Sequence, residues 1–468
     1  MRNNTTYSSK YIHFQIGTIT VKNSNAGSSA TALIDLGGSY LHVKGNTSGQ
    51  KATLNIDVDT AVNSTYSAGA TIALRINQNG TLNIAAGKTL TVNPKMSVGG
   101  GSYTGALNLG SGSTLTINDA LFFYQNSAIS MGSGSAINGT GSISFAAAGS
   151  YDLSGAISTT GAISVSSGAA VTSSGAFVGG NLTVDGAGSS FIREGDFARN
   201  GKGAEATNGG AIVVTGNYSH IPGNDAKISL KTGGTMTVNS ISLLNNTFIE
   251  DEGSMLWIKN DTTTNRIVQI KNNGVMQIDG DYTIRNDGNR TDFSSSAATV
   301  ITVQSGGKII ADSILLSTAK LNLQSANAFE NSSGNAISLT TDSASAKSLL
   351  QMSANQAFDT ITANTINLEL VISNDAVLTA DFASLNDGMV FVNGFAEHTI
   401  FVSNYEDIAD ANSVFFAYAT KDDEGTLIDA LYFDNGWLSA IAPVPEPATW
   451  AALLGAITLG FAAYRRRK

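Results

Sequence analysis

The chain has 468 residues, and only 13% of them are charged, about half the share found in an average soluble protein. Its 42% apolar residues exclude a wholly disordered chain, and the absence of cysteine excludes disulfides, thiolate metal sites and cysteine nucleophiles. The formal charge of −10 argues against a nucleic-acid partner, because binding to phosphates needs a basic surface.

The N-terminal residues predict a β-strand and no signal peptide. From 11 to 21, apolar residues alternate with polar ones, as in Ile12, Phe14 and Ile16. A secretory signal would instead show a continuous apolar run behind a basic start. We therefore expect a truncated N-terminus or a start codon upstream of Met1.

Residues 12–375 repeat one pattern, a glycine-containing turn followed by a short alternating strand. The spacing is loose, near 20 residues, and the best copies are 80–84, 87–92, 112–117, 180–184, 234–238, 253–258 and 274–278. Turns of a solenoid absorb insertions while their strands stay in register. We therefore predict an all-β fold, a right-handed parallel β-helix, over residues 1–375.

Physical reasoning about one copy supports this fold. In 114–117, Leu115 and Ile117 point one way while Thr114 and Thr116 point the other. One such strand cannot bury its apolar side alone, but stacking strands about 4.8 Å apart buries like residues on like residues. A β-sandwich, or a string of small sandwiches, also has short strands and frequent turns, and is the alternative.

Residues 376–442 are richer in charged and aromatic side chains than the repeats. The end of a solenoid needs a cover, because a bare last turn exposes unpaired strand edges. We predict that 376–442 form the final turns and a small C-terminal β cap.

The C-terminal tail, 443–468, predicts a single transmembrane helix. Residues 448–464 carry no charge and would rise about 26 Å as a helix, enough for a thin bilayer core. Trp450 and Tyr464 lie near its ends, where interfacial aromatics are expected. The basic cluster that follows predicts a cytoplasmic C-terminus and an outside body. A buried core helix, the alternative, would need a polar face, and the span offers only two threonines.

The tail has three parts in a fixed order: the triplet Pro445, Glu446 and Pro447, the apolar span, and the basic end Arg465, Arg466, Arg467 and Lys468. In this order they resemble the PEP-CTERM sorting domain. The resemblance implies recognition by an exosortase, a membrane-embedded cysteine transpeptidase-like enzyme, with processing near Pro-Glu-Pro. It also implies export by the Sec machinery, insertion in the membrane during transit, and a final place at the cell surface or outside the cell.

No residue set predicts catalysis, a cofactor or a metal. The motifs of polygalacturonase-type β-helix enzymes, Gly-His-Gly and Arg-Ile-Lys, are absent, and the four histidines are far apart in the sequence: His13, His42, His220 and His398. The charged stretch 191–205 has two interpretations, a binding loop and a solvated insertion between turns, and the second is preferred. The stretch 250–252 reads as an exposed turn, since it lacks the alternating ligands of a calcium loop.

These features predict an exported structural protein of the cell surface or extracellular matrix, sorted by an exosortase and without enzymatic activity. Its outward Thr, Ser and Asn offer many weak contacts to extracellular polysaccharide, which makes adhesion a further hypothesis. The alternative function is a carbohydrate-active β-helix enzyme, a polysaccharide lyase or hydrolase. An autotransporter passenger is a third hypothesis, and it would need a long C-terminal membrane barrel.

Overall fold

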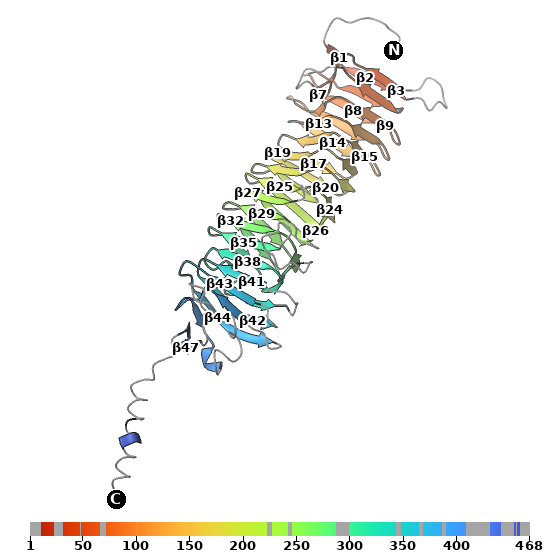
Figure 1. The fold of residues 1–468 in the computed structure, drawn as a ribbon. Helices are drawn as coiled ribbons and strands as arrows, with labels where there is room; N and C mark the ends of the chain where they lie inside the picture. The colour runs from red at the N-terminus through yellow and green to blue at the C-terminus, as the bar shows by residue number, and fades with distance from the viewer. Residues whose placement is uncertain are drawn as a thin grey trace, which may run out of the picture.

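The computed structural model is a rod in which successive turns of the chain, each made of short β-strands, stack on one another from the N-terminal to the C-terminal strands (Figure 1). The residues that the structure describes are 11–22, 31–46, 48–65, 72–100, 102–221, 227–241, 246–286, 299–342, 348–364, 368–385, 390–408, 431–440, 454 and 456–458.

Each turn contributes strands to up to three faces of the rod. The first face is one continuous 17-stranded parallel sheet, sheet A. Its strands are β1 (Tyr11–Gln15), β4 (Tyr40–Lys44), β7 (Leu74–Asn77), β10 (Met96–Val98), β13 (Ala120–Phe123), β16 (Ser142–Phe145), β19 (Ile163–Ser166), β22 (Leu182–Asp185), β25 (Ala204–Thr207), β27 (Ile228–Lys231), β29 (Thr247–Glu250), β32 (Val268–Lys271), β35 (Val300–Gln304), β38 (Lys320–Gln324), β41 (Ser348–Met352), β43 (Leu368–Ile372) and β45 (Val390–Asn393).

The second face consists of two sheets in series along the rod. Sheet B contains β2 (Gly17–Val21), β5 (Ala52–Ile56), β8 (Gly80–Ile84), β11 (Gly105–Leu109) and β14 (Ser127–Met131). Sheet D follows with β17 (Gly149–Leu153), β20 (Ala169–Ser173), β23 (Ser190–Arg193), β26 (Ala211–Ile221), β28 (Thr235–Ile241), β30 (Met255–Ile258), β33 (Val275–Ile278), β36 (Lys308–Ile310) and β39 (Phe329–Glu330), and β24 (Phe197–Asn200) pairs with β26.

The third face is built in the same way from sheets C and E. Sheet C contains β3 (Ala32–Asp35), β6 (Thr60–Asn63), β9 (Thr89–Val92), β12 (Thr114–Ile117), β15 (Ala136–Gly139), β18 (Ala156–Thr159) and β21 (Phe177–Val178). Sheet E contains β31 (Thr262–Thr264), β34 (Asp281–Arg285), β37 (Ser313–Ser317), β40 (Ser338–Thr341), β42 (Gln356–Asn364), β44 (Leu378–Leu385), β46 (Ile400–Val402), β48 (Trp437–Ser439) and β47 (Tyr432–Asp434).

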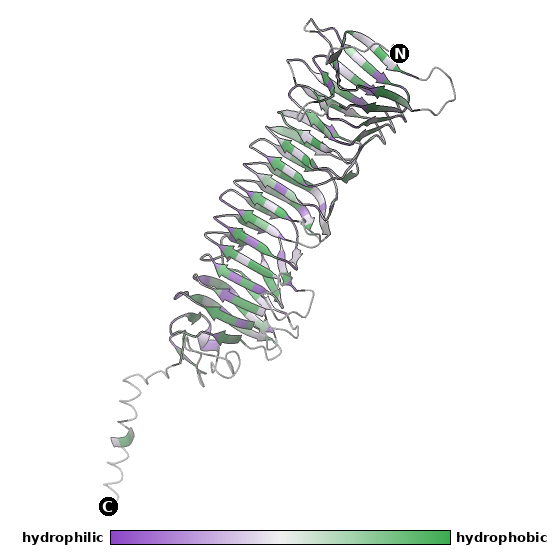
Figure 2. Ribbon diagram, turned by 45° about the horizontal axis from the view of Figure 1, so that its top comes forward, coloured by the Kyte–Doolittle hydropathy of each residue, from purple (hydrophilic) through white to green (hydrophobic). Residues whose placement is uncertain are grey.

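The described residues therefore form an all-β, right-handed parallel β-solenoid with almost no helix, as the repeats predict. Figure 2 shows the alternation of hydrophobic and hydrophilic residues along the strands from which the fold was predicted. The sandwich alternative is excluded, because neighbouring strands of each face come from successive turns and run parallel up to β46, near the end of sheet E.

Like residues stack on like residues inside the rod. In sheet B, Leu54, Leu82 and Leu107 are in register and are at most 4% exposed. Burial of one such side chain contributes about 1.5–3 kcal/mol, so each added turn extends the core by several such increments. On the outer side of the same strands, the Asn108 amide donates to Asn83 Oδ1 at 2.8 Å.

Glycines allow the turns before sheet D to stack closely. Gly209, Gly233 and Gly253 have φ angles of 80°, 76° and 79°, in the left-handed region that favours glycine. A Cβ atom on Gly253 would lie 3.4 Å from the Cα atom of Gly233, so neighbouring turns are in direct backbone contact. Gly87 and Gly112, which begin two other copies of the repeat, also have positive φ angles.

Near its C-terminal end the solenoid changes from parallel to antiparallel pairing. Strands β44 and β46 continue the parallel stack, and β48 then pairs antiparallel with both β46 and β47. The ring of Trp437 lies 5.2 Å from that of Phe401. One short 3-10 helix, η1 (Tyr405–Asp407), follows β46. The last paired edge of sheet E is thus a small antiparallel unit within 376–442.

The inward and outward positions predict different effects of mutation. Replacing Leu107 by alanine removes a buried side chain from the column and should lower the free energy of unfolding by about 2–5 kcal/mol. Because each turn contacts only its neighbours, amide hydrogen exchange should accelerate mainly in β8, β11 and β14. The control Thr116→Ala changes an outward residue and should alter stability by less than about 0.5 kcal/mol. Equal effects of the two changes would contradict the assignment of the core.

Candidate functional site

The sorting residues predicted from the sequence, Pro445 to Pro447 and Arg465 to Lys468, lie outside the described residues. Of the span 448–464, the structure describes only residues 454 and 456–458, which are helical. Within the described part of the chain, no helix combines the length and apolar character needed to cross a membrane.

The charged stretch 191–205 is neither a protruding loop nor a solvated insertion, so that interpretation was wrong. It supplies strands β23 and β24 and the start of β25, and Arg193 and Arg199 point into the solenoid with only 9% and 1% of their surface exposed. Alternation explains this placement, because Arg193 and Arg199 follow the inward Phe191 and Phe197 by two residues.

The two buried guanidinium groups hold turns together by binding backbone carbonyls. Arg199 donates from Nη2 to the carbonyls of Gly180 and Gly203, the second at 2.8 Å, and its guanidinium carbon lies 5.0 Å from the ring centre of Phe197. Burial lowers the pKa of Arg199 to about 10, which leaves it charged at neutral pH. Arg193 donates to Ser173 O at 3.0 Å. These residues are structural rather than ligand-binding.

The second charged stretch, 250–252, belongs to a strand end and a turn. Glu250 ends β29 and lies between two lysines on sheet A, 4.0 Å from Lys231 and 3.1 Å from Lys271. Asp251 and Glu252 lie in the turn that follows, as expected. Among the described residues, no group of three or more His, Asp or Glu side chains could hold a metal ion.

The histidines do not form a site in the part of the chain that the structure describes. His42 lies on β4, near the N-terminal end of the rod, and is only 9% exposed beside Asn77. His398 lies near the other end, with its ring 5.6 Å from that of Trp437.

The most distinctive polar feature is a column of side chains at the edge between the second and third faces. One residue of each of five successive turns occupies the same position, and we call this set the corner column: Asp196, Asn217, Ser240, Asp261 and Asp281. The backbone N–H of Asn217 donates to Asp196 Oδ1 at 2.9 Å, and Ser240 Oγ donates to the side-chain Oδ1 of Asn217 at 3.2 Å. The Asp281 N–H donates to Asp261 Oδ1 at 2.9 Å.

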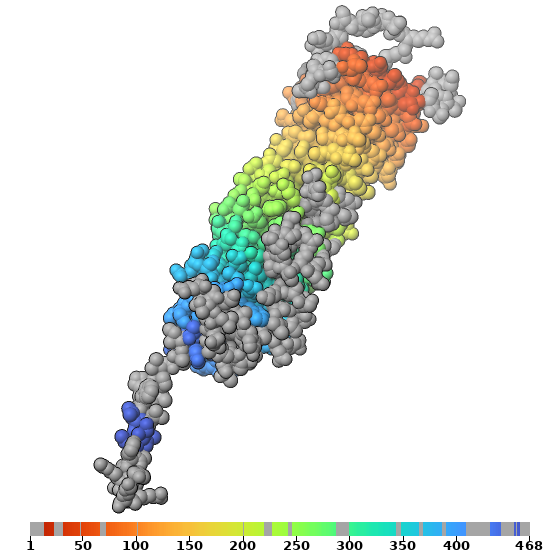
Figure 3. Space-filling view, viewed as in Figure 1, coloured from red at the N-terminus to blue at the C-terminus, as the bar shows by residue number. Residues whose placement is uncertain are grey.

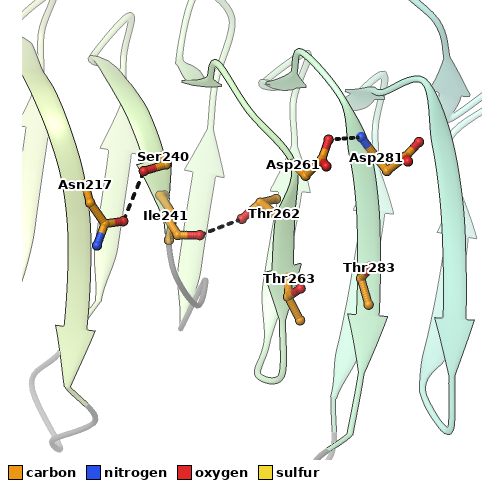
Figure 4. Close-up of a pocket in the computed structure, with 8 residues that line it drawn as sticks. All are labelled: Asn217, Ser240, Ile241, Asp261, Thr262, Thr263, Asp281 and Thr283. Atoms are coloured by element: carbon orange, nitrogen blue, oxygen red, sulfur yellow. Dashed lines mark hydrogen bonds between the residues drawn. The ribbon is translucent and has the colours of Figure 1, made fainter.

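A surface depression of about 440 Å³ lies along this column (Figure 4). Of the turn before β31, the structure describes the third face as far as Ile241, at the end of β28. The carbonyl of Ile241 accepts a hydrogen bond from Thr262 Oγ1 at 3.3 Å. The depression is lined by Asn217, Ser240, Ile241, Asp261, Thr262, Thr263, Asp281 and Thr283.

The sequence carries a signal for the corner column in a short pattern that does not coincide with the glycine-strand repeat. Glycine, then Asp or Asn, then an aromatic residue recurs at 195–197, 216–218 and 280–282. The aromatic residue points inward and is fully buried, while the polar one lies at the corner. A Cβ atom on Gly280 would overlap the carboxylate of Asp261, so glycine is needed for this carboxylate to reach the next turn.

Chemically, the depression presents hydrogen-bonding groups and little else. Asp261 and Asp281 are exposed, and Thr263 and Thr283 are in register beside them. One oxygen of each carboxylate already accepts a hydrogen bond from the protein, since Ser313 Oγ donates to Asp281 Oδ1 at 2.6 Å. Such a surface suits a ligand rich in hydroxyl groups, because hydroxyls both donate and accept.

Comparison with known proteins identifies no relative of the chain. No protein-family model, no curated protein and no solved structure matches it.

Tyr282, which is buried behind the corner column, should make the stability of the rod fall in alkali. Burial raises the pKa of Tyr282 far above its usual value near 10, and the nearby Thr264 side chain opposes this rise only in part. Above pH 10 the unfolded chain therefore binds fewer protons than the folded one at this position, and stability falls as pH rises. Tyr282→Phe should make the urea midpoint fall less steeply above pH 10. An unchanged slope would show that Tyr282 does not govern the alkaline transition.

Proposed function

We propose that the chain is a non-catalytic structural rod of the bacterial cell surface or extracellular matrix, exported by the Sec machinery and sorted by an exosortase. The observation that carries this proposal is the continuity of the stack, in which sheet A alone passes through 17 parallel strands. Stacked turns form an extended, repetitive surface (Figure 3), which suits display and multivalent contact better than the enclosure of one substrate.

The role of the C-terminal tail rests on its sequence. The order Pro445-Glu446-Pro447, apolar span and basic end supports a single transmembrane helix over 448–464, with the C-terminus in the cytoplasm during transit. The basic cluster Arg465, Arg466, Arg467 and Lys468 would hold that end inside.

The outer faces favour association with extracellular polysaccharide. In sheet B the amides of Asn55, Asn83 and Asn108 form a ladder, with donor–acceptor distances of 2.8 Å between neighbours. Each ladder repeats the same polar group at the strand spacing of about 4.8 Å. A polymer with regularly spaced hydroxyls could bind such a surface through many weak contacts.

The alternative, a carbohydrate-active enzyme, rests on one observation, the adjacent carboxylates of Asp261 and Asp281 at the depression. Both already accept hydrogen bonds from the protein, which fits a structural or binding role better than proton transfer. Release of reducing sugars or unsaturated products from a polysaccharide panel, abolished by Asp281→Asn, would favour the enzyme.

Sorting is tested in the native host by following the mass and location of the chain. The wild type should reach the surface in a form that lacks the residues after the Pro-Glu-Pro triplet. Replacing Pro445, Glu446 and Pro447 by alanine should leave the tail attached and the chain in the membrane fraction. The control Thr116→Ala should be sorted as the wild type is. A wild-type chain found in the cytosol with Lys468 still present would refute the proposal.

A further inference from the structure

An aromatic platform lies on sheet D beside the corner column. Trp257 is an outward residue of β30, and its neighbours in register are Thr237 on β28 and Gln277 on β33. The indole Nε1–H donates to Asp279 Oδ2 at 2.7 Å. The other oxygen of Asp279 accepts from Gln277 Nε2 at 2.8 Å. The carboxylate of Asp279 therefore fixes the indole ring and the neighbouring amide in one arrangement.

The ring already contacts an electropositive group. The ammonium group of Lys259, an exposed residue, lies 5.3 Å from the ring centre. The faces of aromatic rings carry partial negative charge and attract such groups, and the attraction is weak when it is exposed to water. The C–H groups on one face of a pyranose ring have the same electropositive character. A sugar could therefore replace the lysine, whose amine would then be free to donate to sugar oxygens.

The platform and the depression are joined through one short segment. Asp279 holds Trp257, Asp281 binds Asp261, and only Gly280 separates the two aspartates. One turn of the rod thus carries an aromatic platform on the second face and polar groups, many of them hydroxyls, at the edge of the third face. This combination is typical of sites that bind sugars, with apolar stacking and a few placed polar groups.

The charges around the platform select against acidic polymers. Within 255–263 and 275–283 the charged residues are three aspartates, Asp261, Asp279 and Asp281, and one lysine, Lys259. A uronic-acid or sulfated chain would bring further negative charge to an acidic edge, and repulsion would weaken its binding.

We propose that Trp257, with Gln277, Asp279 and the adjoining corner column, is a binding subsite for an uncharged, pyranose-containing polysaccharide. The inference rests on the proposed association of the rod with polysaccharide and gives that association a place and a ligand class. It is independent of the exosortase sorting of the chain.

The test uses the purified full-length chain and two sets of probes, uncharged glucans and galactans, and anionic alginate and polygalacturonate. Retardation in gels that contain each polymer gives the affinity. We expect the wild type to bind at least one uncharged polymer, and Trp257→Ala to bind it at least about tenfold more weakly. Trp257→Phe should fall between the two, because a smaller ring remains.

Matched variants separate the platform from general effects on the rod. Asp279→Ala removes both oxygens that hold the indole ring and the Gln277 amide, so it should weaken binding to the uncharged polymer. Phe122→Ala removes another outward aromatic residue, which stacks on Tyr124 at 5.7 Å on sheet A, and it should bind as the wild type does. Circular dichroism and thermal melting establish that each variant is folded.

Tryptophan fluorescence provides a second measurement. The chain has three tryptophans, and changing Trp437 and Trp450 to Phe leaves Trp257 as the sole reporter. The uncharged polymer should shift its emission. No retention by any uncharged polymer, stronger retention by the anionic ones, or full binding by folded Trp257→Ala would each overturn the subsite. The last result would leave polysaccharide association by the rod intact, and failed sorting in the host would leave all these measurements unchanged.

Discussion

The in-register stacking of successive turns is the constraint on which the rest of the structure depends. Each residue has the equivalent residue of the next turn about 4.8 Å away, so every position must tolerate its own repetition. Leucine and isoleucine do so inside the rod, and asparagine does so outside, where each amide can donate to the next. A charged residue does not tolerate repetition in this way, because like charges placed directly opposite one another repel.

The charged residues show how the chain meets this constraint. On sheet A, Lys231, Glu250 and Lys271 occupy one column in three successive turns, so that the sign of the charge alternates. Arginines inside the rod are separated from one another and bind backbone carbonyls, which carry partial negative charge without a second ion. The low charged fraction of the sequence follows from the same rule.

The sequence predicted the features that depend on neighbouring residues in one strand. Alternation and glycine turns were enough to place Leu115 inside, Thr116 outside and the fold among parallel solenoids. The same reading failed for Arg193 and Arg199, because charge was taken as a sign of exposure although alternation placed both inward. The corner column was missed because it depends on which residues of different turns are aligned. Insertions of variable length between turns hide that alignment, so the contact between Asp261 and Asp281 is visible only in the structure.

The corner near β30 and β31 departs from the stacking rule in two ways at once. Two like charges, Asp261 and Asp281, lie in successive turns, and donors such as the Asp281 N–H and Ser313 offset their repulsion only in part. A large aromatic ring, that of Trp257, lies on the adjoining face. A rod that needed only stability would favour uniform ladders at this position, as it has in sheet B. Local departures from the rules that stabilise a fold are expected where function requires them, and in this rod two coincide within two turns.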